Sequence, residues 1–418
     1  MIHPKFTNLL NKPLSRKEFL ALGAFTIASA FGIVGLIREL ASKAASPTAN
    51  TEPENGAVAS PAVVATDSTA SGGKAAKFGA VTPANRDSLV LGAYKPSVAT
   101  TGTIPGITLT TVTTATAYTQ SGTAANPIII QNMKFMNKVN INGCKYLTFK
   151  NCAFYGPPSG ATTAAALTST NFDNANLVFQ DCLFTQQAPT TEAAVGVQGG
   201  HNSTFLRCEF KGTSDCIALV HSQGTWANAH DGPMNLTVHG SYFHDLAYFC
   251  PEPTRDPDDN ASHCDCIQIR GGSNIIVRYN TFVSHLDPNI GAANQPSVDE
   301  WGGPNGTTRI KHISGNKYYP DMNGTSVMMV SPYLAPFHSI YFEYNWVDGG
   351  AASLNLADFG KTGNTDSGFY VRNNKWGRSM RLGEKATIAA LSSAVTSGAL
   401  INTGNVYEDN GAPANFRV

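Results

Sequence analysis

Two short segments fifty residues apart carry side chains that could do chemistry. They read SDCIALV (214–220) and CDCIQIR (264–270). Superposing them places Asp215 over Asp265, each two residues before an isoleucine. Two neighbouring carboxylates can share a proton, hold a cation, or act as an acid and a base. The competing interpretation is that each aspartate only caps a turn by accepting backbone N–H bonds.

Polar loops surround these two segments in the sequence. They include AHDGP (229–233), the long stretch 243–263, SHLDP (284–288) and SVDEWGG (297–303). The side chains expected to bind substrate from this part of the chain are His230, Asp231, Trp226 and Trp301. Tryptophan offers a flat apolar face for a sugar ring, so these loops predict the walls of a carbohydrate-binding groove.

A repeat of about 30 residues must position these groups. An apolar-x-apolar strand, a turn and an aromatic or apolar residue recur at 147–154, 177–184, 203–210, 236–243, 275–282, 311–318, 340–347 and 369–376. One coil cannot cover its own apolar face, so coils must stack at about 4.8 Å and align like residues in ladders. The fixed register favours a β-solenoid over an immunoglobulin-like sandwich, which would show isolated hairpins.

The sixth position of the repeat forms a small polar ladder. It reads Cys152, Cys182, Cys208, Ser241, Asn280, Asn316, Asn345 and Asn374. Stacked side-chain amides can bond to one another and to turn backbone, so these asparagines are predicted to be structural. The three cysteines at this position are predicted to be small buried core residues. Elsewhere, Cys250 could pair with Cys264, and Cys216 and Cys266 could pair or simply stack.

The composition argues against two classes of partner. Lysine plus arginine (29) balances aspartate plus glutamate (29), and charged residues make up 14% of the chain. Without a basic field, nucleic acid is not an expected partner, and membrane contact is expected only through the N-terminal segment.

The N-terminal region differs from the rest. Basic residues precede the apolar run ALGAFTIASAFGIVGLI (21–37), so residues 1–43 are predicted to be an export signal or a membrane anchor formed by a hydrophobic helix. SRKEFLALG resembles a twin-arginine signal with Lys17 in place of the second arginine. Residues 44–85 are predicted to be a disordered Ala/Ser/Thr/Pro linker, and residues 86–418 to be the solenoid domain.

The asparagine ladder resembles that of right-handed parallel β-helices of the pectin-lyase-like superfamily, over roughly residues 96–407. YFHDL (242–246), residues 262–282 and NWVDGG (345–350) are similar to strings of secreted bacterial β-helix proteins related to pectate lyases. The resemblance implies an all-β, right-handed parallel β-helix of about nine to eleven coils. Cys266 stands where that family has glycine. The recurring polar positions that the resemblance assigns are His244, Asp245, His263, Asp265 and Gln268.

A partial resemblance to polygalacturonase-type glycoside hydrolases rests on DCIAL (215–219) and RIK (309–311). The Gly-His-Gly loop of that family has no good counterpart in this sequence. This resemblance implies an inverting hydrolase, whose two carboxyl groups lie about 6.5–9.5 Å apart.

The pectate-lyase resemblance implies a different chemistry. In a lyase, carboxylates hold Ca²⁺, the ion neutralises a uronate carboxyl, and a base removes the neighbouring proton. The Ca²⁺ ligands would be Asp215, Asp245 and Asp265. The base would be Arg270, Lys311 or His263, with Asp215, Asp265 and His244 as further catalytic candidates and Gln268 and Lys311 as substrate contacts.

The sequence therefore predicts an exported, carbohydrate-active β-helix protein that cleaves an extracellular, uronate-containing polysaccharide as a lyase. An inverting hydrolase and a non-catalytic glycan-binding or adhesion protein stay open as alternatives, because a solenoid fold does not fix a function. The oligomeric state is left open. A short helix is expected around 385–400, near the C-terminal end of the stack.

Overall fold

The computed structural model forms two compact units, Met1–Gly79 and Ala80–Val418. It describes residues 62–66, 74–78, 86–158, 165–171, 173–187, 195–219, 233–247, 264–269, 272–284, 286–287, 312–314, 317–319, 326–330, 337–350, 353–356, 367–378, 388–390 and 398–414. The hydrophobic helix expected within 1–43 lies outside these residues. Among the described residues, no helix has the length and apolar character needed to cross a membrane.

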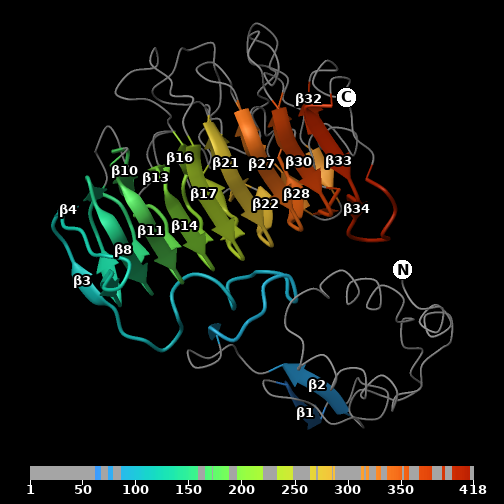
Figure 1. Ribbon diagram of the computed structural model, residues 1–418. Helices are drawn as coiled ribbons and strands as arrows, with labels where there is room; N and C mark the ends of the chain where they lie inside the picture. Colours follow the sequence, from blue (N-terminus) through green and yellow to red (C-terminus); the bar gives the residue numbers. More distant parts are fainter. Residues whose placement is uncertain are drawn as a thin grey trace, which may run out of the picture. The chain divides into compact units, whose positions relative to one another are not determined.

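The larger unit is a right-handed parallel β-helix, in which each coil gives one strand to each of three parallel sheets of nine, nine and ten strands (Figure 1). This confirms the predicted fold and number of coils. The first sheet contains β4 (Thr116–Tyr118), β7 (Val139–Ile141), β10 (Leu167–Ser169), β13 (Val195–Gly199), β16 (Asp215–Leu219), β20 (Asp265–Ile269), β26 (Ser326–Val330), β29 (Leu354–Leu356) and β32 (Ile388–Ala390).

The second and third sheets follow the first in every coil. The second contains β5 (Ile128–Gln131), β8 (Lys145–Lys150), β11 (Ala175–Gln180), β14 (Ser203–Leu206), β17 (Pro233–His239), β21 (Gly272–Arg278), β27 (Phe337–Glu343), β30 (Ser367–Arg372) and β33 (Leu400–Thr403). The third contains β3 (Thr110–Val112), β6 (Met133–Phe135), β9 (Ala153–Phe154), β12 (Leu183–Phe184), β15 (Glu209–Phe210), β18 (Tyr242–Phe243), β22 (Thr281–Ser284), β28 (Trp346–Gly349), β31 (Lys375–Trp376) and β34 (Val406–Tyr407).

Three short pairs lie outside these sheets. β1 (Ala62–Thr66) and β2 (Lys74–Phe78) pair antiparallel within the stretch expected to be a linker. β19 (Leu246–Ala247) pairs parallel with β23 (Leu286–Asp287) at the corner where the chain leaves the third sheet. β24 (His312–Ser314) and β25 (Lys317–Tyr319) form an antiparallel hairpin.

That hairpin corrects one predicted coil. The segment 311–318 was expected to be a coil of the solenoid with Asn316 in the ladder, but β21 pairs directly with β27 and β22 with β28. The apolar-x-apolar pattern belongs to a strand of this hairpin, and Asn316 itself lies outside the described residues. The short helix expected around 385–400 is also wrong at Ile388–Ala390, which forms β32.

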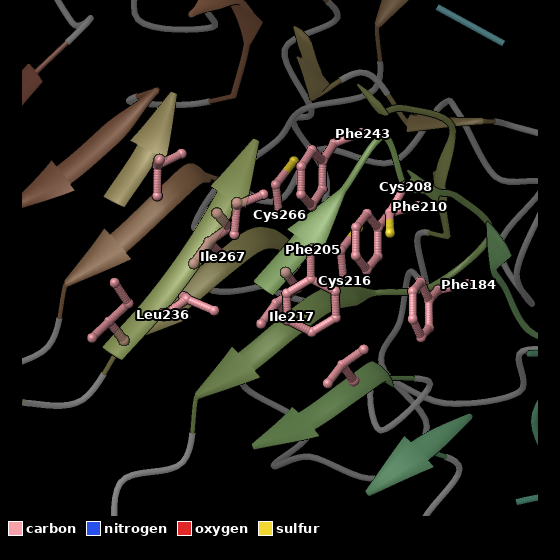
Figure 2. Packing of buried hydrophobic residues seen from close by; sticks show 14 of the residues in the cluster. Phe184, Phe205, Cys208, Phe210, Cys216, Ile217, Leu236, Phe243, Cys266 and Ile267 are labelled. Carbon is pink, nitrogen blue, oxygen red and sulfur yellow. The ribbon is translucent and has the colours of Figure 1, made fainter. Parts of the chain in front are cut away.

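The core consists of ladders of like residues, as the repeat predicted. The ring centroids of Phe154, Phe184 and Phe210 are 4.8 Å apart from coil to coil, and Phe243 follows Phe210 at 4.5 Å. Figure 2 shows the rings of Phe184, Phe210 and Phe243 and the neighbouring Cys208 side chain within the packed interior. All four rings are completely buried. Such stacked aromatic burial supplies hydrophobic stabilisation in every coil and fixes the register between coils.

The asparagine ladder lies where the chain passes from the second sheet to the third. The side-chain amide of Asn345 donates to the Val277 carbonyl at 3.0 Å, and its Oδ1 accepts the backbone N–H of Asn280 at 2.9 Å. The Asn374 Oδ1 atom accepts the Asn345 N–H in the same way at 2.9 Å. These bonds confirm the structural role predicted for the asparagines, and Asn405 extends the ladder by one coil.

Cysteines continue this ladder toward the N-terminal coils. The Cys208 thiol donates to the Phe179 carbonyl at 3.3 Å, and the Cys182 thiol to the Phe149 carbonyl at 3.5 Å. These carbonyls lie at the repeat position that accepts the amide of Asn345. Both cysteines, and Cys152, are completely buried thiols, as predicted. Cys216 is also a buried thiol rather than half of a disulfide, and Cys250 lies outside the described residues.

The segment 86–107 packs on the corner between the second and third sheets. The N–H of Ile104 donates to the Asn151 Oδ1 atom at 2.6 Å, and Gly102 N–H donates to the Arg207 carbonyl at 2.9 Å. The buried Arg207 guanidinium makes two 2.8 Å bonds to the buried Asp181 carboxylate. Ion pairs therefore join coils at this corner in addition to the ladder.

Candidate functional site

The two aspartates predicted to be catalytic begin neighbouring strands of the first sheet. β16 and β20 pair in the predicted register, with Ile217 opposite Ile267 and Ala218 opposite Gln268. Asp215 and Asp265 therefore occupy the same position of successive coils. The Asp265 backbone N–H donates to the Asp215 Oδ1 atom at 2.9 Å, which joins the two residues directly.

The burial of this pair is unequal. Asp265 is completely buried, and Asp215 is half-buried. Alternation along the strands places both aspartates on the side of Ile217 and Ile267, which faces the core. The bond that Asp215 accepts from Asp265 is the one that the turn-cap interpretation predicts.

A buried carboxylate needs compensation for the loss of water, from hydrogen bonds, a cation or a proton. The Gln268 side-chain amide lies 3.4 Å from the Asp265 Oδ2 atom and supplies one such contact. Gln268 is itself half-buried and is therefore reachable from the outer side of the strand. The site therefore contains a buried carboxyl group, a half-buried carboxyl group and an accessible amide. The two carboxyl groups are of the type that can transfer protons, and the amide can bond to a polar ligand.

A second polar cluster lies at the end of β18, in the coil before β20. The His244 Nδ1 atom is 2.6 Å from the Asp245 Oδ2 atom, and its Nε2 atom is 3.1 Å from the Glu209 Oε1 atom. Both ring nitrogens face carboxylate oxygens, so both bonds form only when the imidazole carries two protons. Burial lowers the pKa of His244, but the bonds to Asp245 and Glu209 outweigh it and raise the pKa above its ordinary value. His244 is therefore held as a cation.

The carboxylate of Glu209 is the buried partner in this cluster. Burial raises the pKa of Glu209, but the hydrogen bonds from His244 and Lys211 outweigh burial and lower the pKa below its ordinary value. The Lys211 Nζ atom lies 2.8 Å from the Glu209 Oε1 atom. On the other side, the Tyr242 ring stacks on the His244 ring at a centroid distance of 4.1 Å. Two cationic side chains, His244 and Lys211, and the carboxylates of Glu209 and Asp245 thus meet beside an aromatic ring.

Asp245 is the exposed member of the cluster, with 55% of its side chain accessible. Its φ angle of +49° lies in the left-handed region, which turns the chain out of β18. The Gly212 N–H donates to the Asp245 carbonyl at 2.9 Å and holds this turn against the preceding coil. Asp245 therefore presents a carboxylate to solvent from a fixed backbone.

The two clusters belong to one corner of the solenoid. The chain runs from Asp245 into β19, and the Cys264 thiol, one residue before Asp265, donates to the Ala247 carbonyl at 3.1 Å. Across the coils, Ala247 N–H donates to the Thr213 carbonyl, two residues before Asp215. We call this region the polar corner, with the members Glu209, Lys211, Asp215, Tyr242, His244, Asp245, Asp265 and Gln268.

Seven predicted site residues lie outside the described residues. They are His263, Arg270, His230, Asp231, Trp226, Trp301 and Lys311. Their catalytic and binding roles stay predictions. Of the predicted residues that are described, the structure brings His244 and Asp245 together as one pair and Asp215, Asp265 and Gln268 together as another group.

Two members of the corner, Glu209 and Lys211, were not predicted. In the repeat, Glu209 aligns with Tyr242 and Lys211 with His244, because β15 pairs with β18 at Glu209–Tyr242. The sequence signal was a charged pair at positions where earlier coils have Leu183 and Thr185. The signal is visible in an alignment of the outward positions of the repeat, whereas the predictions rest on its inward positions.

The predicted calcium ligands can be compared with the described residues. No three His, Cys, Asp or Glu side chains within the described ranges come together where they could hold a metal ion. Asp215, Asp245 and Asp265, the expected Ca²⁺ ligands, are all among these residues. Calcium binding stays a prediction, and no chemical step below depends on it.

Comparison with known proteins agrees with the architecture. Residues 117–299 match the family model of the right-handed beta helix region, which spans the polar corner. No curated protein matches the chain. The similarity therefore supports the parallel β-helix on which the polar corner is built.

Proposed function

We propose that the chain is an exported protein that binds an extracellular, uronate-containing polysaccharide and cleaves it as a lyase at the polar corner. The observation that carries the proposal is the pair Asp215 and Asp265, which stacks in register and is joined by a 2.9 Å hydrogen bond. A right-handed β-helix is compatible with a carbohydrate-active protein, since its stacked coils present one line of side chains to an extended polymer.

In this proposal the members of the polar corner have different tasks. Asp245, the exposed carboxylate, contacts the sugar hydroxyls, and its side chain is held by the bond from His244. His244 is a positioning residue and not a base, because both of its nitrogens are engaged by carboxylates. Asp215 and Asp265 are the proposed acid–base pair beside the reacting sugar, and the Gln268 amide donates a hydrogen bond to Asp265.

The elimination itself needs three changes. A base removes the proton on the carbon next to the uronate carboxyl, the bond to the leaving sugar oxygen breaks, and that oxygen takes up a proton. The unsaturated product retains the electron pair as a carbon–carbon double bond. Of the proposed bases, His263 and Arg270 stand on either side of β20 in the sequence, and Lys311 precedes β24.

One observation favours the non-catalytic alternative. Asp265 is completely buried, and Asp215 accepts a backbone bond that a purely structural cap would also accept. A glycan-binding or adhesion module with the same scaffold would use the exposed Asp245 and the aromatic rings without turnover.

A panel of purified polysaccharides tests the proposal. The full chain is incubated with uronate polymers and with neutral glycans, and products are followed by ultraviolet absorbance and by reducing ends. Absorbance together with new reducing ends supports a lyase. Reducing ends without absorbance overturn the lyase in favour of the hydrolase, and binding with neither signal favours the adhesion module.

Variants link activity to the corner. Asp215→Asn is expected to reduce turnover by about 10²-fold or more, the usual contribution of a positioned acid or base. Asp173→Asn makes the same chemical change at an exposed position in an earlier coil and is the matched control. Equal activity of Asp215→Asn and Asp173→Asn would remove the polar corner from the mechanism.

A further inference from the structure

A group of cationic and aromatic side chains lies on the outer face of the second sheet, in the coil of Asp265 and the two coils that follow it. It consists of Arg278 on β21, Tyr341 and Glu343 on β27, and Tyr370 and Arg372 on β30. Strand pairing places Glu343 directly between Arg278 and Arg372, and Tyr341 opposite Tyr370. We call these five residues the guanidinium platform.

The two guanidinium groups share one carboxylate. The Arg278 Nε atom lies 2.7 Å from the Glu343 Oε2 atom, and the Arg372 Nε atom lies 2.5 Å from the Glu343 Oε1 atom. The Glu343 side chain is 4% exposed, whereas the arginine side chains are 32% and 35% exposed. The negative charge is therefore buried beneath two positive groups that reach solvent, which leaves one net positive charge on the outer surface.

The tyrosine rings hold the arginines in place. The Tyr341 and Tyr370 rings stack at 4.9 Å with 6° between their planes. The Arg278 guanidinium carbon is 5.5 Å from the Tyr341 ring centre, and that of Arg372 is 4.6 Å from the Tyr370 ring centre. Stacking on aromatic rings and a bond through Nε restrict both guanidinium groups before any ligand arrives, which lowers the entropy cost of binding.

The spacing of the platform suits an extended anionic polymer. Arg278 and Arg372 lie two coils apart, which is about 9.6 Å at the usual spacing of paired strands. A guanidinium group matches a carboxylate through paired N–H bonds, and it does so better than a lysine ammonium. The chain as a whole has no net charge, so the local positive surface is not a consequence of a basic protein.

We propose that the guanidinium platform is a second polysaccharide-binding site, separate from the polar corner, which recognises the carboxylates of a uronate polymer. The substrate class rests on the proposed function. The platform retains the polymer on the protein and performs no chemistry.

Binding is measured by the retardation of the full chain in gels that contain polygalacturonate. The matched ligand is the same polymer with its carboxyl groups methyl-esterified. The proposal predicts retardation by the acid form, weak or no retardation by the ester, and loss of retardation as salt screens the charges. Equal retardation by both forms, or no retardation by the acid form, overturns it.

The variant that tests the site removes the whole ion triad. Arg278→Gln, Glu343→Gln and Arg372→Gln are combined, because deleting one partner alone would leave a buried charge uncompensated and destabilise the fold. The apparent affinity for polygalacturonate is expected to fall about tenfold or more, since at least one charge-assisted bond is lost. Affinity equal to that of the wild type overturns the proposal.

The control is Arg378→Gln, which changes the net charge by the same amount. Arg378 also lies on an aromatic ring, 3.8 Å from the centre of Tyr407, and bonds to Asp409, but it follows β31 of the third sheet. Affinity reduced equally in this control would show a general charge effect and overturn the platform. Because retardation is scored without turnover, a protein that binds through the platform and cleaves nothing upholds this inference while the lyase proposal fails.

Discussion

The corner between the second and third sheets and the polar corner use the same device with different side chains. In both, a side-chain oxygen accepts the backbone N–H of the equivalent residue one coil away, at 2.9 Å for Asn345 with Asn280 and for Asp215 with Asp265. The asparagine also donates to a strand carbonyl, so its polar atoms are satisfied within a neutral ladder. The carboxylate brings a charge and no donor.

The neutral ladder and the carboxylate pair differ in the effect that each added member has on stability. A neutral ladder can extend over many coils because each added amide satisfies the next one. Stacked carboxylates lose stability with each addition unless a proton, cation or ligand compensates. The pair Asp215 and Asp265 is therefore the part of the solenoid for which we propose a role beyond folding.

The largest effect is expected from Arg207→Ala at the corner between the second and third sheets, which we call the ladder corner. This change leaves the buried Asp181 carboxylate without the two 2.8 Å bonds of the guanidinium, which should lower the free energy of unfolding by about 3–5 kcal/mol. Chemical denaturation measures it. Arg378→Ala, which breaks an exposed pair with Asp409, is the control and should cost less than about 1 kcal/mol. Similar losses for both would contradict the structural assignment of this corner.

Asn345→Ala should destabilise the protein by about 2–4 kcal/mol, because the Val277 carbonyl and the Asn280 N–H lose their buried partner. Asn345→Ser, which places at this coil the residue that Ser241 provides in the same ladder, should cost less. The activity of each folded molecule should be unchanged. A loss of activity without a loss of stability would break the comparison, because the neutral ladder would then serve chemistry.

The pH dependence of stability should have opposite signs at the two corners. Burial, followed by the field of Arg278, lowers the pKa of His239 at the ladder corner to about 4. The unfolded chain then binds a proton that the folded chain rejects between pH 6.5 and about 4, so stability is complete above this window and falls as the pH falls through it. The full loss corresponds to about 3 kcal/mol.

At the polar corner the pKa of His244 is raised, so its contribution is complete below the ordinary value of 6.5 and is lost as the pH rises through the folded pKa. Denaturation of His239→Gln and His244→Gln between pH 4 and 9 separates the two. His239→Gln should flatten the acid side and His244→Gln the alkaline side. The same change in both variants would contradict the assigned signs.

Much of the fold was predictable because the repeat is local and its register is strict. Phe154, Phe184 and Phe210 recur at one position, and superposing residues 214–220 on 264–270 places Asp215 over Asp265, as the strand pairing has it. The hairpin β24–β25 was not predictable in the same way. A single strand of a coil and a strand of a hairpin share one apolar-x-apolar pattern, and only the pairing partner distinguishes them.

The candidate site was less accessible to sequence reasoning. The pairing of Asp215 with Asp265 followed from the register between coils. The complete burial of Asp265 depends on how the surrounding side chains pack, and a sequence alignment does not contain that information. The bond from His244 to Glu209 joins residues 35 positions apart in the chain. The bond from His244 to Asp245 joins adjacent residues. The first of these required knowing which outward side chains meet between coils.

The most direct test compares activity and stability in one variant, Asp265→Asn, which preserves the size of the side chain and removes its charge. We expect turnover of a uronate polymer to fall by about 10²-fold or more while the free energy of unfolding stays within about 1 kcal/mol of the wild type. Full turnover in Asp265→Asn, or a protein that loses its fold while each remaining folded molecule stays active, would contradict the claim that the charged pair serves chemistry.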